Sequence, residues 1–96
     1  MRLIYSRSAL ADLDKYYNWI AEDNPVGAEE WYSKMCKTCD ALALKPRPGR
    51  PCEYASELNK IVEGNYFIYF TVGPDAVEIE RIINRNRDQP SALQEE

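Results

Sequence analysis

The sequence contains no histidine, and it contains only three cysteines. Cys36 and Cys39 form a C-x-x-C pair, but a structural zinc site needs four ligands and only Cys52 remains to join them. Three cysteines are also too few, and odd in number, for a secreted disulfide scaffold. The sequence therefore predicts free thiols, no metal and no cofactor, with Cys39 as a small core residue.

Long hydrophobic runs are missing as well. No stretch approaches the ~18 consecutive apolar residues that a membrane-spanning helix needs. Residues 1–4 lead directly into patterned sequence, without the apolar segment of a signal peptide. We therefore expect a cytoplasmic protein with no membrane partner.

The chain lacks an excess of basic charge, since 12 Lys and Arg residues face 16 Asp and Glu residues for a net charge of -4. Affinity for nucleic acid comes from clustered Lys and Arg, so we expect no direct, specific nucleic-acid binding by this chain alone. The charges are unevenly placed, however. Arg81, Arg85 and Arg87 lie close together with only Asp88 beside them, which places any basic contact site near the C-terminal end.

The patterned part of the chain predicts a single α+β domain over residues 1–96. Residues 2–5 are β-prone, and Ser6 then offers a hydroxyl that can cap a helix running to about residue 22. Apolar residues at helical spacing form one stripe on this helix. The stripe consists of Leu10, Leu13, Tyr17 and Ile20.

A second helix is predicted to follow at once, because Asn24 can cap it and Pro25 suits its first turn. One face of this helix is apolar and consists of Ala28, Trp31, Met35, Cys39 and Leu42. Trp19 and Trp31 are interpreted as aromatic residues that pack within the helical hairpin. The prolines of the run 46–51 forbid helix and predict a connector loop.

Beyond the loop the periodicity changes to that of strands, over residues 60–63, 66–72 and 76–84. Gly64 and Asn65 suit a tight turn with positive φ at the glycine, and residues 73–75 suit a second turn. These three strands are predicted to form an antiparallel meander. Residues 89–96 are polar and acidic, and we expect a frayed tail there.

Several local motifs occur along the chain in a fixed order. They are Ser8-Ala9-Leu10-Ala11-Asp12-Leu13, residues 17–20, Pro48-Gly49-Arg50-Pro51, Gly64-Asn65-Tyr66-Phe67-Ile68-Tyr69-Phe70, residues 77–81, and Ile82-Ile83-Asn84-Arg85-Asn86-Arg87-Asp88. None is specific alone, but their order and spacing over roughly residues 2–90 resemble the ParE branch of the RelE/ParE toxin superfamily. The resemblance implies a RelE/ParE-like fold: an N-terminal strand, a helical hairpin and a three-stranded meander.

The resemblance also implies a function. Members are toxins of type II toxin-antitoxin systems, held silent in a hetero-oligomer with a cognate antitoxin whose disordered segment folds on binding. The ParE branch is known for inhibiting DNA gyrase, and the RelE branch for cleaving mRNA on the ribosome. We therefore expect an antitoxin partner, with gyrase as the target.

The choice between the branches depends on proton transfer, since RNA cleavage needs groups that accept and donate a proton. Relatives often place a histidine where this chain has Asn84, whose amide cannot serve near neutral pH. The candidate bases are Glu53, Glu57 and Glu63, with Arg81 or Arg85 to stabilise charge. We favour a non-catalytic gyrase inhibitor. The alternatives are a RelE-like ribosome-dependent mRNA endonuclease and a non-toxic relative that only binds an antitoxin.

The predicted target contacts are Arg81, Arg85, Arg87 and Lys60. Arg81 shares the parity of Val77, Ile79, Ile83 and Arg85 in the last strand, so a structural ion pair for Arg81 is an equal alternative. The alternative for Lys60 is a solvated lysine at a sheet edge.

The predicted antitoxin contacts are Phe67, Tyr69 and Ile82. The strand over residues 66–72 is apolar on both faces, so one face can pack on the hairpin while the other exposes aromatic area for a partner. The alternative is that residues 46–58 or the C-terminal tail cover that second face within the monomer.

Overall fold

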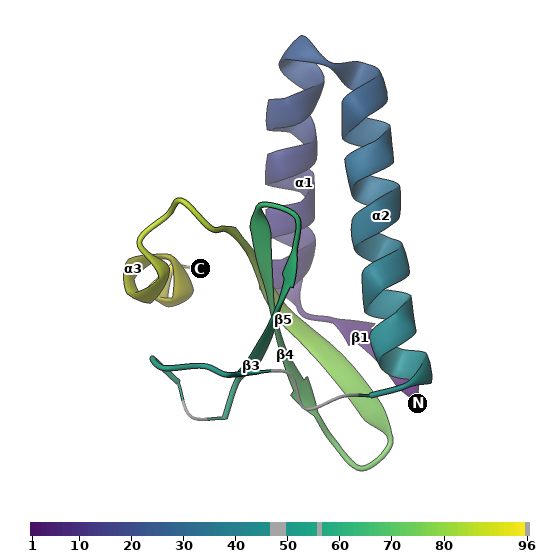
Figure 1. Cartoon of the computed structure of the whole chain (residues 1–96), viewed down its shortest axis with the longest axis vertical. Coiled ribbons are helices and arrows are strands. Elements are labelled where there is room, and N and C mark those ends of the chain that lie inside the picture. Colours follow the sequence, from purple (N-terminus) through teal and green to yellow (C-terminus); the bar gives the residue numbers. More distant parts are fainter. Residues whose placement is uncertain (47–49, 56, 96) are drawn as a thin grey trace.

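The strands form one five-stranded mixed sheet in the order β1-β5-β4-β3-β2 in the computed structural model, which describes residues 1–46, 50–55 and 57–95. The elements follow the chain as β1 (Arg2–Tyr5), α1 (Arg7–Asp23), α2 (Pro25–Leu44), β2 (Arg50–Pro51), β3 (Asn59–Glu63), β4 (Tyr66–Val72), β5 (Ala76–Asn84) and α3 (Gln89–Gln94). Figure 1 shows α1 and α2 side by side, with the tip of their hairpin projecting beyond the sheet. The predicted α+β class is confirmed.

Side-chain caps fix the start of both long helices, as the sequence predicts. The Ser6 hydroxyl oxygen accepts the Ala9 N–H at 3.0 Å, and Asn24 Oδ1 accepts the Gly27 N–H at 2.9 Å. A Cβ at Gly27 would collide with the side-chain amide of Asn24, so a larger residue there would require the capping side chain to shift. Within the described ranges, no helix is both long enough and apolar enough to cross a membrane.

The antiparallel meander of β3, β4 and β5 is confirmed. Gly64 has a φ of 59°, as the first turn requires, and the Gly73 N–H closes the second turn on the Ala76 carbonyl at 2.8 Å. β1 joins the sheet parallel to β5. The prediction of a connector loop over residues 46–51 is wrong for β2, which pairs with β3 at the sheet edge, where a proline is tolerated. Residues 47–49 of that loop lie outside the described part.

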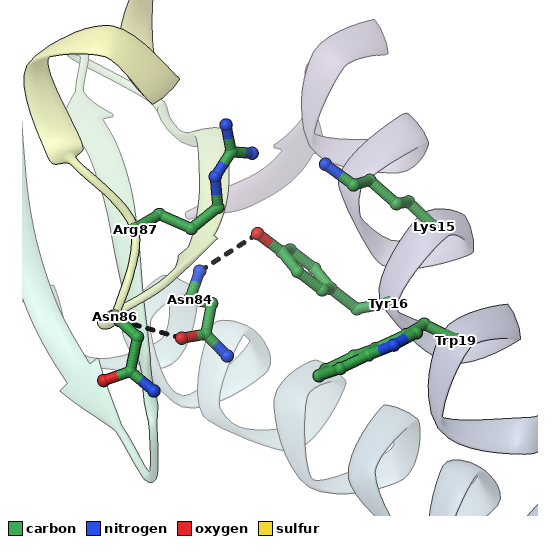
Figure 2. A pocket seen from close by; sticks show the side chains of 6 residues that line it. All are labelled: Lys15, Tyr16, Trp19, Asn84, Asn86 and Arg87. Carbon is green, nitrogen blue, oxygen red and sulfur yellow. Dashed lines mark hydrogen bonds between the residues drawn. The ribbon is translucent and has the colours of Figure 1, made fainter. Parts of the chain in front are cut away.

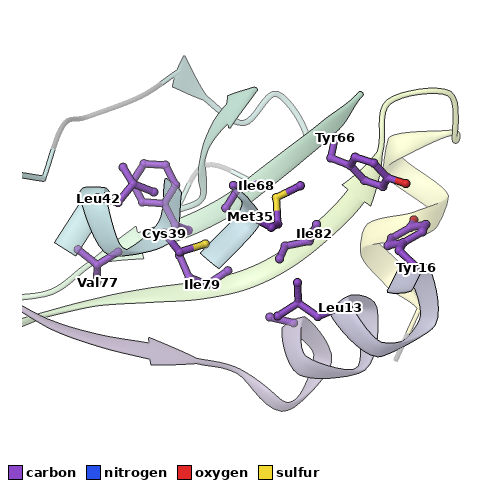
Figure 3. Close-up of a cluster of buried hydrophobic side chains, with 12 residues drawn as sticks. Leu13, Tyr16, Met35, Cys39, Leu42, Tyr66, Ile68, Val77, Ile79 and Ile82 are labelled. Atoms are coloured by element: carbon purple, nitrogen blue, oxygen red, sulfur yellow. The ribbon is translucent and has the colours of Figure 1, made fainter. Parts of the chain in front are cut away.

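One face of the sheet packs against the hairpin and forms the main core (Figure 3). The predicted apolar face of α2 is confirmed, with Met35 and Cys39 at most 1% exposed. The predicted stripe on α1 is confirmed at Leu13 but wrong at Leu10, which is 49% exposed, while Ala9 and Tyr16 are buried. The helix turns Ala9, Leu13 and Tyr16 towards the sheet.

The other face of the sheet carries a smaller core that Cys52, Ala55, Leu58 and α3 cover. It contains Cys52, Tyr69, Ile83 and Ala92, which are all at most 5% exposed. The expectation of a frayed tail is wrong for Gln89–Gln94, which form α3. Burial of Ala92, and a hydrogen bond of 2.8 Å from the Tyr69 hydroxyl to Gln89 Oε1, hold this helix on the sheet.

A β-bulge changes which side chains of β5 share a face. Tyr69 lies opposite Arg81, but Phe70 lies opposite Ile79, so the ladder skips Glu80. Val77 and Ile79 therefore face the hairpin with the main core, while Ile83 belongs to the smaller core on the other side. The predicted common face from Val77 to Arg85 is wrong for this reason.

Candidate binding site at the end of strand β5

Beyond the end of β1, side chains of α1 and of its N-cap residue Ser6 form hydrogen bonds with the backbone of β5. β1 ends at Tyr5, opposite Ile79, which leaves the following backbone groups of β5 without a strand on that side. The Ser6 hydroxyl donates to the Glu80 carbonyl at 2.8 Å. The Ile82 N–H donates to Asp12 Oδ2 at 3.0 Å, and the Asn84 N–H donates to the Tyr16 hydroxyl oxygen at 3.1 Å. These three bonds hold the end of β5 against α1.

Arg81 joins α1 to α3 across this end of the sheet. Its Nε and Nη2 donate to the two carboxylate oxygens of Asp12 at 2.7 and 3.0 Å, a bidentate pair. Its Nη1 donates to the carbonyls of Ala92 and Glu95 at 2.8 and 2.9 Å. The hydrogen bond to Asp12 raises the pKa of Arg81, although burial opposes it. The ion-pair alternative describes Arg81 better than target contact, because its donors are directed inside the domain.

A groove of about 450 Å³ lies between α1 and the turn from β5 to α3 (Figure 2). The residues that line it are Lys15, Tyr16 and Trp19 from α1, Asn84 at the end of β5, and Asn86 and Arg87 from the turn. The interpretation of Trp19 as a packing residue is wrong, because its side chain lines this groove and is 60% exposed. We call this feature the indole groove.

A carboxylate from the C-terminal segment pairs with Arg87, one of the residues that line the indole groove. Glu95 Oε2 lies 2.6 Å from Arg87 Nη2, and both side chains are partly exposed. The hydrogen bond from Arg87 lowers the pKa of Glu95, with further contributions from the positive charges of Lys15 and Arg81. Three cations therefore act on one carboxylate at this place.

A second set of cations gathers on the sheet face of the smaller core, which α3 partly covers. The Lys60 Nζ lies 4.6 Å from the centre of the Phe67 ring, and the Arg85 Cζ lies 5.5 Å from it. Arg85 is exposed, whereas Lys60 is only 8% exposed and pairs with Glu53 at 3.8 Å. The alternative of a solvated edge lysine is wrong, because β2 pairs with β3 at Lys60. We call Lys60, Phe67 and Arg85 the cationic patch.

The predicted antitoxin contacts differ in their accessibility. Phe67 is half-buried beneath the two cations of the patch. Tyr69 and Ile82 are 0% exposed, in the smaller core and the main core respectively. The expectation that the second face is open is therefore wrong at Tyr69, which Cys52, Leu58 and α3 cover, as the alternative held. Ile82 lies on the hairpin face, inside the main core.

The three glutamates considered as bases lie in different places. The Glu63 carboxylate accepts from the Thr38 hydroxyl at 2.6 Å, on the hairpin side of the sheet. Glu57 lines a different pocket beside Arg81. Glu53 is the member of the set that reaches the cationic patch, through Lys60.

The cysteines have no part in these surfaces. Cys39 is 0% exposed, and its burial raises the pKa of the thiol to about 11, which confirms it as a core residue. Among the described residues, no group of three or more metal-binding side chains gathers at one point.

Sequence reasoning found Arg87 and Lys60 but missed Lys15, Trp19 and Asn86. Lys15 and Trp19 are four residues apart, so helical spacing alone puts them on one face of α1. Asn86 carried no such signal, because the turn after β5 determines where it lies. Asp12 was missed as a partner of Arg81, since the sequence separation between them is 69 residues.

Comparison with known proteins identifies the family of this chain. The model for "ParE toxin of type II toxin-antitoxin system, parDE" matches residues 3–89. A solved chain of the chromosomal ParDE TA system from P. aeruginosa superposes with a TM-score of 0.77 at 24% identity, covering 88% of this chain and 95% of that one. No match was found among curated proteins. The family match extends from β1 to the start of α3, and on this ground the chain belongs to the ParE toxin family.

Proposed function

We propose that this chain is a cytoplasmic toxin that inhibits DNA gyrase by binding it, and that a cognate antitoxin neutralises it in a hetero-oligomer. Family membership supports the toxin-antitoxin part of this proposal. The observation that carries the target is the cationic patch, in which Lys60 and the exposed Arg85 lie against Phe67. Arginine and aromatic side chains, here Arg85 and Phe67, are enriched in protein interfaces.

The patch supports binding more than proton transfer. The sequence has no histidine, and Asn84 ends β5 with an amide that neither accepts nor donates a proton near neutral pH. Arg81 is engaged by Asp12 and the end of α3, so it is poorly placed to stabilise charge on a phosphate. A surface that binds a protein needs none of these groups.

One observation favours the second candidate, a ribosome-dependent mRNA endonuclease. Glu53 lies 3.8 Å from Lys60, so a carboxylate stands beside the cations of the patch. A carboxylate there could accept a proton from a ribose hydroxyl, and Arg85 could stabilise the developing charge. This arrangement lacks an identified proton donor.

A DNA supercoiling assay tests the proposal directly. Purified chain is titrated into gyrase, relaxed plasmid and ATP, and we expect lost supercoiling or trapped, cleaved DNA. Arg85→Ala should raise the inhibitory concentration about tenfold, the effect of losing roughly 1.4 kcal/mol of contact energy. Lys37→Ala is the matched control, since Lys37 is an exposed cation on α2, and it should leave inhibition unchanged.

A translation assay separates the candidates. Ribosome-dependent cleavage of mRNA by the wild-type chain, lost in Glu53→Gln, would establish the endonuclease and overturn the gyrase proposal. If the folded chain affects neither assay but binds its antitoxin, the non-toxic relative is the correct reading.

A further inference from the structure

The indole groove has the composition of a recognition site for a peptide. Trp19 stands on one wall with its indole 60% exposed, and the Tyr16 ring lines the groove beside it. Tryptophan is among the residues most enriched in interface hot spots, because a large ring is desolvated at little cost in conformational entropy. A volume of about 450 Å³ is within the range of sites that take a small ligand or a few side chains.

The charges at the groove select for an anion. Lys15 lies on the α1 side and Arg87 lies on the opposite side, in a chain whose net charge is -4. Asn84 and Asn86 add amide groups that can bond to a peptide backbone. An apolar surface between two cations fits a ligand that presents an apolar group and a negative charge together.

The chain itself shows which anion Arg87 accepts. The Glu95 carboxylate already lies 2.6 Å from Arg87 Nη2, with side-chain exposures of 47% and 33%. Exposed ion pairs of this kind contribute little to stability, so an incoming carboxylate can replace Glu95 at small cost. Glu95 therefore acts as an internal competitor for the same position.

We propose that the indole groove binds a peptide segment of a protein partner in which a large apolar side chain lies next to a carboxylate. The apolar side chain packs on Trp19, and the carboxylate takes the place of Glu95 on Arg87, with Lys15 on the opposite wall as a second cation. This site is distinct from the cationic patch, and the inference does not depend on gyrase as the target.

A peptide fits better than a nucleic-acid strand. A strand brings a phosphate for each nucleotide, and outside the groove it would meet the acidic part of α1, including Asp14, Glu22 and Asp23. A peptide with one or two carboxylates places its charge only where Lys15 and Arg87 can meet it.

Titration of the full chain with defined probes tests the inference. The probe is a short acetylated and amidated peptide of alternating leucine and glutamate; the matched peptide replaces glutamate with glutamine, and AMP represents nucleotides. Binding is followed by the Trp19 indole N–H signal in ¹H–¹⁵N spectra, with Trp31, which packs against the main core, as the internal reference. We expect the glutamate peptide to bind about tenfold more tightly than the glutamine peptide, as loss of a charge contact predicts.

Variants divide the site into its parts. Trp19→Ala should weaken peptide binding about tenfold or more, as read by calorimetry, and Arg87→Gln should weaken it about fivefold. Glu95→Gln removes the competitor, so it should tighten binding about twofold. Val26→Ala is the control: Val26 is 69% exposed on α2 outside the groove, and its truncation should change nothing. Unchanged thermal unfolding of each variant excludes a folding defect.

Three outcomes would overturn the inference. The first is AMP binding at Trp19 more tightly than the glutamate peptide, which would make this a nucleotide site. The second is a Trp19 signal that no probe moves. The third is weaker peptide binding by Glu95→Gln, since that would make Glu95 a supporting residue and not a competitor.

Discussion

The two faces of the sheet are covered to very different depths. The hairpin face packs against helices of 17 and 20 residues and forms a core of 12 buried residues. The other face is covered by Cys52, Ala55, Leu58 and a helix of six residues, in a core of four buried residues. The first face therefore supplies most of the apolar burial that stabilises the fold, and the second leaves Phe67 and Arg85 within reach of a partner.

The largest expected effect on stability comes from the ion pair of Asp12 and Arg81, which joins α1 to α3. Asp12→Ala leaves Arg81 as a buried cation without its carboxylate and also removes the acceptor of the Ile82 N–H. Breaking such a pair from one side costs about 3–5 kcal/mol of unfolding free energy. Urea denaturation measures it, with Asp14→Ala, an exposed acid on the same helix, as the control. A loss below about 1 kcal/mol would show that α3 does not need this anchor.

Two neighbouring isoleucines on β5 allow the two cores to be compared directly, because each lies in a different core. Ile82 packs in the main core and Ile83 in the smaller one, and both are at most 1% exposed. Truncation to alanine costs about 2–5 kcal/mol, depending on how far the surroundings collapse into the cavity. We expect Ile82→Ala near the top of that range and Ile83→Ala near the bottom, because a six-residue helix can shift more easily than the hairpin. Equal losses of unfolding free energy in urea denaturation would contradict the expectation that α3 shifts more easily than the hairpin.

Alkaline pH should loosen the thinly covered face through Tyr69. Its burial, with a smaller effect of nearby Cys52, raises the pKa of the Tyr69 hydroxyl to about 12 from its ordinary value of about 10. The raised pKa means that this contribution to stability is intact below pH 10 and is lost as the pH rises towards 12. In Tyr69→Phe the decline over this interval should be shallower. The same variant should lose about 1 kcal/mol at neutral pH, because the bond to Gln89 is gone.

The smallest effect is expected at Leu10. Its side chain is 49% exposed on α1, away from both cores. Leu10→Ala should change the unfolding free energy by less than about 0.5 kcal/mol, as for other surface substitutions. Leu13→Ala on the same helix is the matched comparison and should cost about 2–5 kcal/mol. A large loss of unfolding free energy in Leu10→Ala would show that Leu10 is part of the core, as its spacing in the sequence predicts.

Local signals in the sequence predicted the elements well. The caps at Ser6 and Asn24 and the glycine at position 64 each determine backbone geometry within a few residues. The phase of α1 could not be predicted in this way. Leu10 and Ala9 differ by one helical position, so spacing alone does not tell which of them faces the sheet. The bond between Asp12 and Arg81 of β5, which is distant in sequence, helps to fix the rotation of α1.

The candidate site was less predictable for the same reason. The cationic patch needs β3, β4 and β5 in register before Lys60 and Arg85 meet on Phe67. The bulge at Glu80 changes which residues of β5 share a face, and the residue types there do not predict a bulge. The indole groove depends on the turn between Asn84 and α3, whose course follows from tertiary contacts.

The parallel pairing of β1 with β5 has a consequence for synthesis. β5 lies between β1 and β4, yet it begins only at residue 76. A growing chain therefore exposes β1, the hairpin and the first two strands of the meander before the strand that joins them exists. Folding of this domain can be completed only after β5 has been translated, so a product that terminates before residue 76 cannot assemble either the indole groove or the cationic patch.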